Sequence, residues 1–453
     1  MTEHQNVRRM ALQTLLAVRE DGGQSHFIMR ETLDANPRMT EQERSFYRRL
    51  TAGTLEYTLK LDYIINCFSR TRTEKMKPVI REILRMAVYQ ISEMDAVPDS
   101  AAVNEAVKLA QKTGYRGLSG FVNGVLRAVS RDLQKVKYPD RSDMVSYMEI
   151  RYSMPENLLR AWIEEYGVEK TENICAGFYR KRPVTVRLRG ENAGKIREEL
   201  RDGRTSSGLK LLQAPYISDA FYLASEGSPA GYPEFTDGSL IVQDVSSQIA
   251  VRAAGIREGS TVLDLCAAPG GKTVLAADLT GRDGHVFSRD ISEKRAARIR
   301  ENVTRCRLEN VTVEVKDARE EDGLQADVVI ADVPCSGFGD IGRKPEIRYR
   351  VDEKRIRELT VLQREILSSA VRHLKPGGTL LFSTCTFGHA ENRDNFFWLR
   401  DTFGLQPVPL TDRIPEELLK NEDIRRGAAE GYVQLLPGDA ECDGFFFSCL
   451  KQI

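Results

Sequence analysis

The sequence predicts a multi-domain protein with an all-α N-terminal domain (1–140), a small α+β module (146–235) and a doubly wound α/β domain (236–453). Two observations predict this division. Apolar residues recur at spacings of three and four in the first part of the chain, which indicates amphipathic helices. From about residue 236, short apolar segments alternate with helical patterns, and this order favours a parallel sheet covered by helices.

The composition is typical of a soluble globular protein, with 453 residues of which 41% are hydrophobic and 29% are charged. Basic and acidic side chains number 66 each, so the net charge indicates no particular partner. No apolar run approaches the roughly 18 residues of a membrane helix, and the first residues lack the apolar core of a secretory signal. We therefore expect a cytoplasmic protein without a membrane partner.

The N-terminal domain is expected to consist of helices separated by turns that contain Gly, Pro and Asp. Ser100 follows Val-Pro-Asp and is predicted to cap the last periodic segment. The polar stretch 130–143 is predicted to be a linker. The periodic segments are 7–18, 46–68, 79–94 and 100–113.

The middle module combines two predicted helices, 155–167 and 169–180, with the alternating pattern of a strand at 183–190. Three clusters along the chain mix arginine with aromatic residues, a combination suited to phosphate contacts and base stacking. Solvated surface charge is the alternative interpretation of each cluster. The clusters are "RSFYRRL" (44–50), "FYRKRPVTVRLRG" (178–190) and "GRKPEIRYR" (342–350).

The third domain is predicted to alternate strands with helices, and a turn at 375–378 precedes its fifth strand. In such a sheet, ligands bind beyond the carboxyl ends of the strands, so residues at these ends are the candidates for a site. The predicted strands are 261–267, 285–290, 311–317, 326–332, 379–385 and 444–451, and the predicted helices are 272–280, 292–306, 354–374 and 390–403.

The first of these strands leads into "DLCAAPGGKT" (264–273), whose two glycines would let the backbone approach a ligand. Cys266 stands where a P-loop requires its first glycine, and GxGxxG is also absent, so neither nucleotide-binding loop fits. Asp290 ends the second strand, as suits ribose hydroxyls, and Asp317 follows the third, where it is placed to bind an adenine amino group. The combination predicts a nucleoside cofactor without a triphosphate. The alternative role of either aspartate is a helix N-cap.

Two cysteines stand at predicted strand ends: Cys385 ends the fifth strand, and Cys335 follows the fourth strand together with Asp332. Because the ends of adjacent parallel strands converge, these side chains are expected to lie together. A thiolate that attacks C6 of a cytosine or uracil makes C5 nucleophilic toward a methyl group, and a nearby carboxyl stabilises the charge on the ring. For an isolated cysteine the alternative is burial as a small hydrophobic residue. No CxxC or HExxH occurs, so no metal site is predicted.

Six motifs stand out in the second half of the chain: "QDVSSQ" (243–248), "LDLCAAPGGKT" (263–273), "ADVPCSGFG" (331–339), "RKPEIRYR" (343–350), "FSTCTFGHAEN" (382–392) and "CDGFFFSCLK" (442–451). They closely resemble those of the RNA (cytosine-5)-methyltransferases that use S-adenosylmethionine. Segments 7–18 and 84–129 resemble the NusB-type helical RNA-binding domain. Together they are similar to the RsmB (Sun/Fmu) family, which methylates one cytosine of small-subunit (16S) ribosomal RNA. The resemblance spans nearly the whole chain and implies a Rossmann-like methyltransferase domain.

The resemblance implies a role for each matching residue. Cys385 would be the nucleophile, Cys335 would assist release of the methylated base, and Asp332 would face both cofactor and target base. The chain has Asp-Val-Pro-Cys where the family commonly has Asp-Ala-Pro-Cys, and Gly-His-Ala-Glu-Asn (388–392) where Pro-Glu-Glu-Asn is frequent, but the reactive groups remain. The residues implied to hold S-adenosylmethionine are Cys266, Ala267, Ala268, Pro269, Gly270, Gly271, Lys272, Asp290, Asp317 and Asp332.

The same chemistry on transfer RNA or another RNA is the nearest alternative function, and the NusB-like domain favours the ribosomal substrate. A non-catalytic RNA-binding or antitermination protein is a second alternative. The joint presence of both cysteines, the aspartate and the glycine loop argues against it. The sequence does not determine the oligomeric state, for which a monomer is the expectation.

Overall fold

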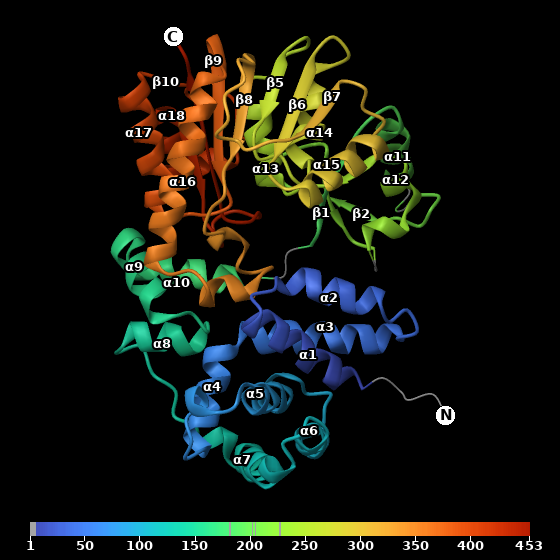
Figure 1. The fold of residues 1–453 in the computed structure, drawn as a ribbon, viewed down its shortest axis with the longest axis vertical. Coiled ribbons are helices and arrows are strands. Elements are labelled where there is room, and N and C mark those ends of the chain that lie inside the picture. The colour runs from blue at the N-terminus through green and yellow to red at the C-terminus, as the bar shows by residue number, and fades with distance from the viewer. Residues whose placement is uncertain (1–5, 181–182, 202, 204, 226–227) are drawn as a thin grey trace. The chain divides into compact units, whose positions relative to one another are not determined.

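A computed structural model describes residues 6–180, 183–201, 203, 205–225 and 228–453 of the chain (Figure 1). The chain divides into two compact units. The helical unit comprises Met1–Ala176 and Ile341–Arg350, and the α/β unit comprises Gly177–Asp340 and Val351–Ile453. This division differs from the predicted domains 1–140, 146–235 and 236–453, because the first helices of the middle module pack with the N-terminal helices.

The helical unit is built around a core of leucine, isoleucine, valine and alanine side chains contributed by its amphipathic helices. Thr40 and Glu43 form a reciprocal capping box at the start of α3, and the chain bends at Tyr57, which separates α3 from α4 within the predicted segment 46–68. The helices are α1 (Val7–Glu20), α2 (Ser25–Asp34), α3 (Glu41–Glu56), α4 (Thr58–Phe68), α5 (Pro78–Glu93), α6 (Asp99–Lys112), α7 (Ser119–Asp132), α8 (Met144–Arg151), α9 (Glu156–Tyr166) and α10 (Val168–Gly177).

Two local predictions for this unit are wrong. Helix α6 begins at Asp99 after Pro98 and has no side-chain cap, so Ser100 lies within the first turn rather than at the N-cap. The predicted linker 130–143 is partly helical, because α7 continues to Asp132 and a 3₁₀ turn follows over Leu133–Lys135.

Residues Ile341–Arg350 leave the α/β part of the chain and complete the helical unit. Their 3₁₀ helix, Pro345–Tyr349, carries a carboxylate and a guanidinium that are both buried. Glu346 accepts hydrogen bonds from the backbone N–H (2.8 Å) and the hydroxyl (2.7 Å) of Ser25. Arg348 donates to the backbone oxygen of Tyr152 at 3.0 Å. The segment is therefore fastened to the helical unit by buried polar contacts.

Two arginines of the basic–aromatic clusters fit neither of the interpretations that the sequence left open, RNA contact or solvated surface charge, because both are buried. Arg348 is 1% exposed and Arg187 is 3% exposed, and both side chains bind groups of the protein itself. Arg187 forms an ion pair with Asp278 at 2.8 Å. Lys181 and Arg182, from the same cluster as Arg187, lie outside the described residues.

A small antiparallel sheet opens the α/β unit, with strand order β2-β3-β1-β4. Its apolar side chains form a core of their own with α11. Its elements are β1 (Thr185–Leu188), α11 (Asn192–Arg201), β2 (Leu211–Gln213), β3 (Ala220–Leu223), α12 (Pro233–Thr236) and β4 (Leu240–Val242).

The main sheet has the strand order β10-β12-β9-β8-β5-β6-β7, and β11 pairs with β12. Strands β9, β8, β5, β6 and β7 are parallel, whereas β10, β11 and β12 are antiparallel to their partners. The strands are β5 (Thr261–Asp264), β6 (His285–Asp290), β7 (Val311–Val315), β8 (Ala326–Asp332), β9 (Leu374–Thr384), β10 (Gln406–Pro407), β11 (Tyr432–Leu435) and β12 (Phe445–Lys451). The sheet is therefore mixed: the predicted parallel arrangement is confirmed for β5 to β9, whereas the last predicted strand, β12, is antiparallel to β9.

Side chains alternate along the parallel strands, so that Val328 and Ile330 join one core cluster while Val329 and Ala331 join another. Helices α13, α14 and α18 contribute to the first cluster, and α16 and α17 contribute to the second. The helices are α13 (Val245–Ala253), α14 (Gly271–Thr280), α15 (Glu293–Arg305), α16 (Glu353–Arg372), α17 (Arg393–Phe403) and α18 (Glu422–Glu430). This is a doubly wound arrangement, whose strand order reverses between β5 and β8.

The predicted turn at 375–378 is part of strand β9, which runs without a break from Leu374 to Thr384. The pairing of β9 with β8 shifts register between Ala326 and Val328, and this irregularity accommodates the extra residues. None of the helices in the described parts of the chain combines the length and apolar character needed to cross a membrane.

Candidate active site

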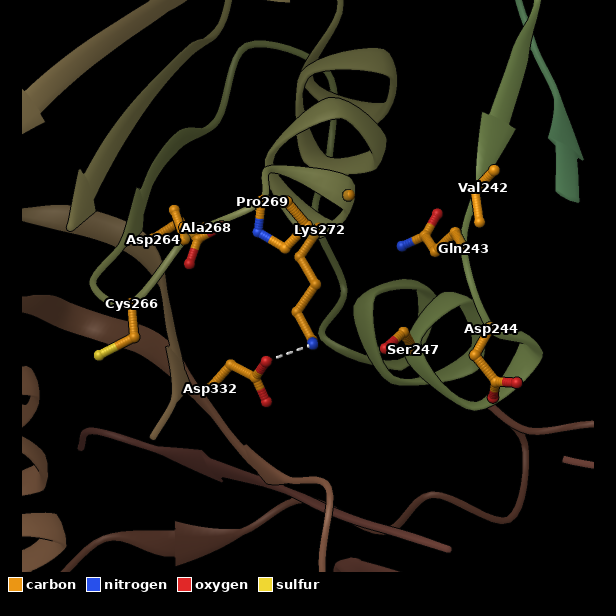
Figure 2. Close-up of a pocket in the computed structure, with 12 residues that line it drawn as sticks. Val242, Gln243, Asp244, Ser247, Asp264, Cys266, Ala268, Pro269, Lys272 and Asp332 are labelled. Carbon is orange, nitrogen blue, oxygen red and sulfur yellow. Dashed lines mark hydrogen bonds and ion pairs between the residues drawn. The ribbon is translucent and has the colours of Figure 1, made fainter. Parts of the chain in front are cut away.

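The loop between β5 and α14 forms one wall of a cavity that contains about 510 Å³ of space, counting the part open to solvent (Figure 2). Gly270 has a φ of +104°, a left-handed conformation that disfavours residues with a Cβ, and α14 starts immediately after it. The cavity thus combines a glycine turn, a helix N-terminus and a strand switch point. Its lining residues are Val242, Gln243, Asp244, Ser247, Asp264, Cys266, Ala267, Ala268, Pro269, Gly271, Lys272 and Asp332.

Lys272 and Asp332 form an ion pair across the cavity, with 2.6 Å between Nζ and Oδ2 (Figure 2). The other carboxylate oxygen of Asp332 accepts a hydrogen bond from the Ser383 hydroxyl at 2.8 Å. Burial is the largest influence on the pKa of Lys272 and lowers it, but the charge and the hydrogen bond of Asp332, together with the charge of Asp264, outweigh burial and the pKa is raised. The ammonium therefore stays charged and fixes one oxygen of Asp332, while Ser383 fixes the other.

Asp264, at the end of β5, is completely buried at the base of the same cavity. The Thr273 hydroxyl donates to its Oδ2 at 2.8 Å, whereas Oδ1 has no hydrogen-bond partner among the described residues. Burial raises the pKa of Asp264 from 3.8 to about 7, against the opposing influence of Thr273 and Lys272. One oxygen of this cavity-lining carboxylate is thus buried without a hydrogen-bond partner among the described residues.

Asp264 predicts a pH-dependent stability. Because its folded-state pKa is raised, its stabilising contribution is complete in acid and is lost as the pH rises from about 4 through about 7. The Asp264→Asn variant keeps the acceptor for Thr273 but cannot ionise. As the pH rises from 4 to 8, its free energy of unfolding should therefore increase relative to that of the wild type by a few kcal/mol, at about 1.4 kcal/mol per pKa unit. Urea unfolding of both proteins at several pH values measures this difference. Parallel pH profiles would contradict it.

Cys335 and Cys385 meet at the carboxyl ends of adjacent parallel strands, β8 and β9, as expected from the sequence. Their sulfur atoms lie 3.3 Å apart, and the Gly339 N–H donates to the backbone oxygen of Cys385 at 3.0 Å. The hydrogen bond to Cys385, and then burial, raise the pKa of Cys335. Cys335 is consequently held in the thiol form next to Cys385.

Asp290 and Asp317 were predicted to bind the cofactor together with the loop 266–272, but they do not line the cavity that most of these loop residues line. Among the described residues that line the cavity, neither is found. Asp290 is buried at the end of β6 and pairs with Arg295 at 3.1 Å. Asp317 follows β7 and pairs with Arg319 at 2.7 Å, which lowers the pKa of Asp317. Their roles at a cofactor stay predictions.

Sequence reasoning did not assign a binding role to Gln243, Asp244 or Ser247, which line the cavity from the chain before and within α13. The Nε2 of Gln243 is buried and has no hydrogen-bond partner among the described residues. All three residues lie in the motif "QDVSSQ", which is the feature of the sequence from which they could have been identified. Within the described parts of the chain, no cluster of three His, Cys, Asp or Glu side chains is arranged to hold a metal ion.

Two family models match the chain. The model described as 16S rRNA methyltransferase RsmB/F matches residues 253–451, and the NusB family model matches residues 5–131. The first covers the main sheet with both cysteines, and the second covers α1 to most of α7.

A relative from Bacillus subtilis, named probable ribosomal RNA small subunit methyltransferase B, is 32% identical over 99% of both chains. The crystal structure of PH0851 covers 98% of each chain with a TM-score of 0.80 at 24% identity. NSun6 from Pyrococcus horikoshii, solved with SFG, has a TM-score of 0.53 at 20% identity and covers 66% of this chain and 98% of its own. The two solved structures establish the fold.

Proposed function

The chain belongs to the RsmB/F family of 16S rRNA methyltransferases, and on that premise we propose that it methylates C5 of one cytosine in small-subunit ribosomal RNA, with S-adenosylmethionine as methyl donor. The proposed route is a covalent adduct between Cys385 and C6 of the base. The observation that carries the proposal is the pair of thiols 3.3 Å apart, one of which, Cys335, follows the cavity-lining Asp332 by three residues. This pair has no use in transfer to a nitrogen or oxygen atom, which needs no thiol nucleophile.

The residues of the cavity suit S-adenosylmethionine. The glycine turn leaves room for close backbone approach, and one buried polar atom each of Asp264 (Oδ1) and Gln243 (Nε2) has no partner among the described residues, which a polar ligand can provide. Gln243, Lys272 and Asp332, with the loop 266–271, would hold it. When bound there, S-adenosylmethionine supplies an electrophilic methyl group. Asp290 and Asp317 are proposed to extend the site along the ends of β6 and β7.

The first proposed step is attack of the Cys385 thiolate on C6 of the cytosine, which breaks the C5–C6 double bond and leaves its electron pair on C5. Asp332, held between Lys272 and Ser383, is placed to accept a hydrogen bond from the amino group of the cytosine and so orient the ring, while the Lys272 ammonium opposes the negative charge that develops. The resulting carbanion-like C5 would then take the methyl group as its bond to the sulfonium sulfur breaks, with S-adenosylhomocysteine as the leaving group. Positive charge on Lys272 keeps the aspartate oriented rather than free to rotate.

Release of the methylated base is the proposed task of Cys335. Loss of the C5 proton to water re-forms the C5–C6 double bond, and the C6–S bond breaks with both electrons on the Cys385 sulfur. The neighbouring Cys335 thiol, 3.3 Å away, is placed to donate a hydrogen bond to the departing thiolate. A thiol with a raised pKa retains the proton that this bond requires.

The test is transfer of labelled methyl groups from S-adenosylmethionine to unmodified 16S rRNA, followed by bisulfite sequencing of the product. We expect one methylated cytosine in the ribosomal RNA. Methylation of bulk transfer RNA without any transfer to ribosomal RNA would retain the chemistry and overturn the substrate. Absence of methylated cytosine in both RNAs would overturn the proposed reaction.

A further inference from the structure

A buried carboxylate lies close to the two cysteines and has no part in the proposed reaction steps. Glu391, in the 3₁₀ helix His389–Glu391, is 1% exposed. Its Oε1 accepts hydrogen bonds from the backbone N–H of Ser336 at 2.8 Å and from Nε2 of Gln363 at 3.0 Å. Burying a carboxylate costs several kcal/mol unless bonds of this kind compensate. An internal carboxylate at this position therefore needs an explanation beyond packing.

The two partners of Glu391 hold the backbone on both sides of Cys335. Ser336 follows Cys335 directly, and its N–H is bound by Glu391. On the other side, Nε2 of Gln363 donates to the backbone oxygen of Pro334 at 2.9 Å while it also donates to Glu391. The other end of the Gln363 amide accepts from Nδ2 of Asn395 at 2.9 Å, so its orientation is fixed. Glu391 and Gln363 thus hydrogen-bond the backbone immediately after and immediately before Cys335.

The same turn is joined to the backbone that carries Cys385. The hydroxyl groups of Ser336 and Thr386 lie 2.7 Å apart, and each residue directly follows one of the two cysteines. Glu391 itself lies in the short segment that follows Cys385. The polar contacts therefore fix the two cysteine-bearing turns relative to each other, and not only the position of each.

We propose that Glu391 is a positioning residue for the release step: through Ser336 and Gln363 it holds the Cys335 thiol at hydrogen-bonding distance from the Cys385 sulfur. This inference rests on the proposed function. A site that depends on such a bond tolerates displacements of only about 0.5 Å. Loss of the Glu391 contacts frees the turn at Ser336, so the thiol no longer meets the departing sulfur. Attack by Cys385 on the base does not need these contacts.

The test compares Glu391→Ala and Glu391→Gln in the full-length protein with Asp394→Ala, an exposed acid three residues further along, as matched control. The readouts are steady-state turnover, the fraction of enzyme in a denaturation-stable adduct with RNA, and S-adenosylmethionine affinity by calorimetry. We expect Glu391→Ala to lower turnover at least tenfold, to accumulate adduct, and to bind S-adenosylmethionine within twofold of wild type. Glu391→Gln, whose amide oxygen still accepts from Ser336, should restore most of the turnover.

Thr386→Val provides a second route to the same answer, since it removes the hydroxyl link without a cavity and is expected to accumulate adduct as well. If Glu391→Ala turns over at the wild-type rate and accumulates no adduct, the inference is overturned and the proposed function stays intact. If Glu391→Ala does not fold, the same result in Thr386→Val decides the question. Equal loss of turnover and of cofactor affinity overturns it too, because the role is then only structural. Failure of the wild type to methylate cytosine instead overturns the proposed function.

Discussion

The Cys385→Ala variant should lose methyl transfer by roughly 10⁴-fold or more, the scale seen when a covalent nucleophile is removed. Its affinity for S-adenosylmethionine should stay at the wild-type value, because Cys385 is not among the described residues that line the cavity. Cys335 cannot replace it, since its pKa is raised and its backbone is held by Glu391 and Gln363. Labelled methyl transfer and calorimetry measure the two quantities separately.

The matched control is Cys67→Ala, which removes an exposed thiol of the helical unit and should transfer methyl groups at the wild-type rate. A Cys385→Ala enzyme with full activity would mean that the nucleophile is misassigned. If Cys335→Ala then proved inactive without any adduct, the roles of the two sulfur atoms would be exchanged.

The Cys335→Ala variant should become trapped on its RNA. Attack by Cys385 and transfer of one methyl group remain available, but the thiol 3.3 Å from the leaving sulfur is gone. We expect at most about one methyl group per enzyme molecule and a covalent complex that survives denaturing electrophoresis. Normal multiple turnover would contradict the proposed role of Cys335.

A double variant, Cys335→Ala with Cys385→Ala, separates this result from non-specific cross-linking. It should form no complex with RNA, because the sulfur that bonds to C6 is absent. A complex that persisted in the double variant would have to arise from another of the eight cysteines, and the adduct would then carry no information about the proposed reaction.

The sequence predicted the parts of the site that depend on local pattern. Strands β6 and β8 have the predicted bounds, 285–290 and 326–332, because each of the two segments ends at an aspartate, Asp290 or Asp332. From the order of the strands it also followed that Cys335 and Cys385 converge. In a parallel sheet, adjacency alone brings such residues together.

Other features could not be predicted because they depend on contacts between distant parts of the chain. The apolar run of β12 reads the same whether the strand is parallel or antiparallel, and only its pairing with β9 decides. Likewise, a Lys-Pro-Gly-Gly run is typical of a turn, but here it belongs to strand β9, because a register shift against β8 accommodates the extra residues. Arg348 lies in a basic–aromatic cluster of the kind that suits RNA contacts. Its guanidinium nevertheless donates to backbone carbonyl oxygens of the protein itself.

The insertion of Ile341–Arg350 into the helical unit has a consequence for the order in which the protein can mature during synthesis. When Ala176 has emerged from the ribosome, the helical unit still lacks the segment whose Glu346 and Arg348 occupy its interior. At roughly 5–20 residues per second, translation reaches Arg350 only after about ten to thirty-five seconds. The N-terminal helices up to Ala176 must wait, without the segment that completes their unit, until the strands that carry the glycine loop and Asp332 have been made. Maturation of the N-terminal unit is therefore tied to synthesis of most of the catalytic machinery.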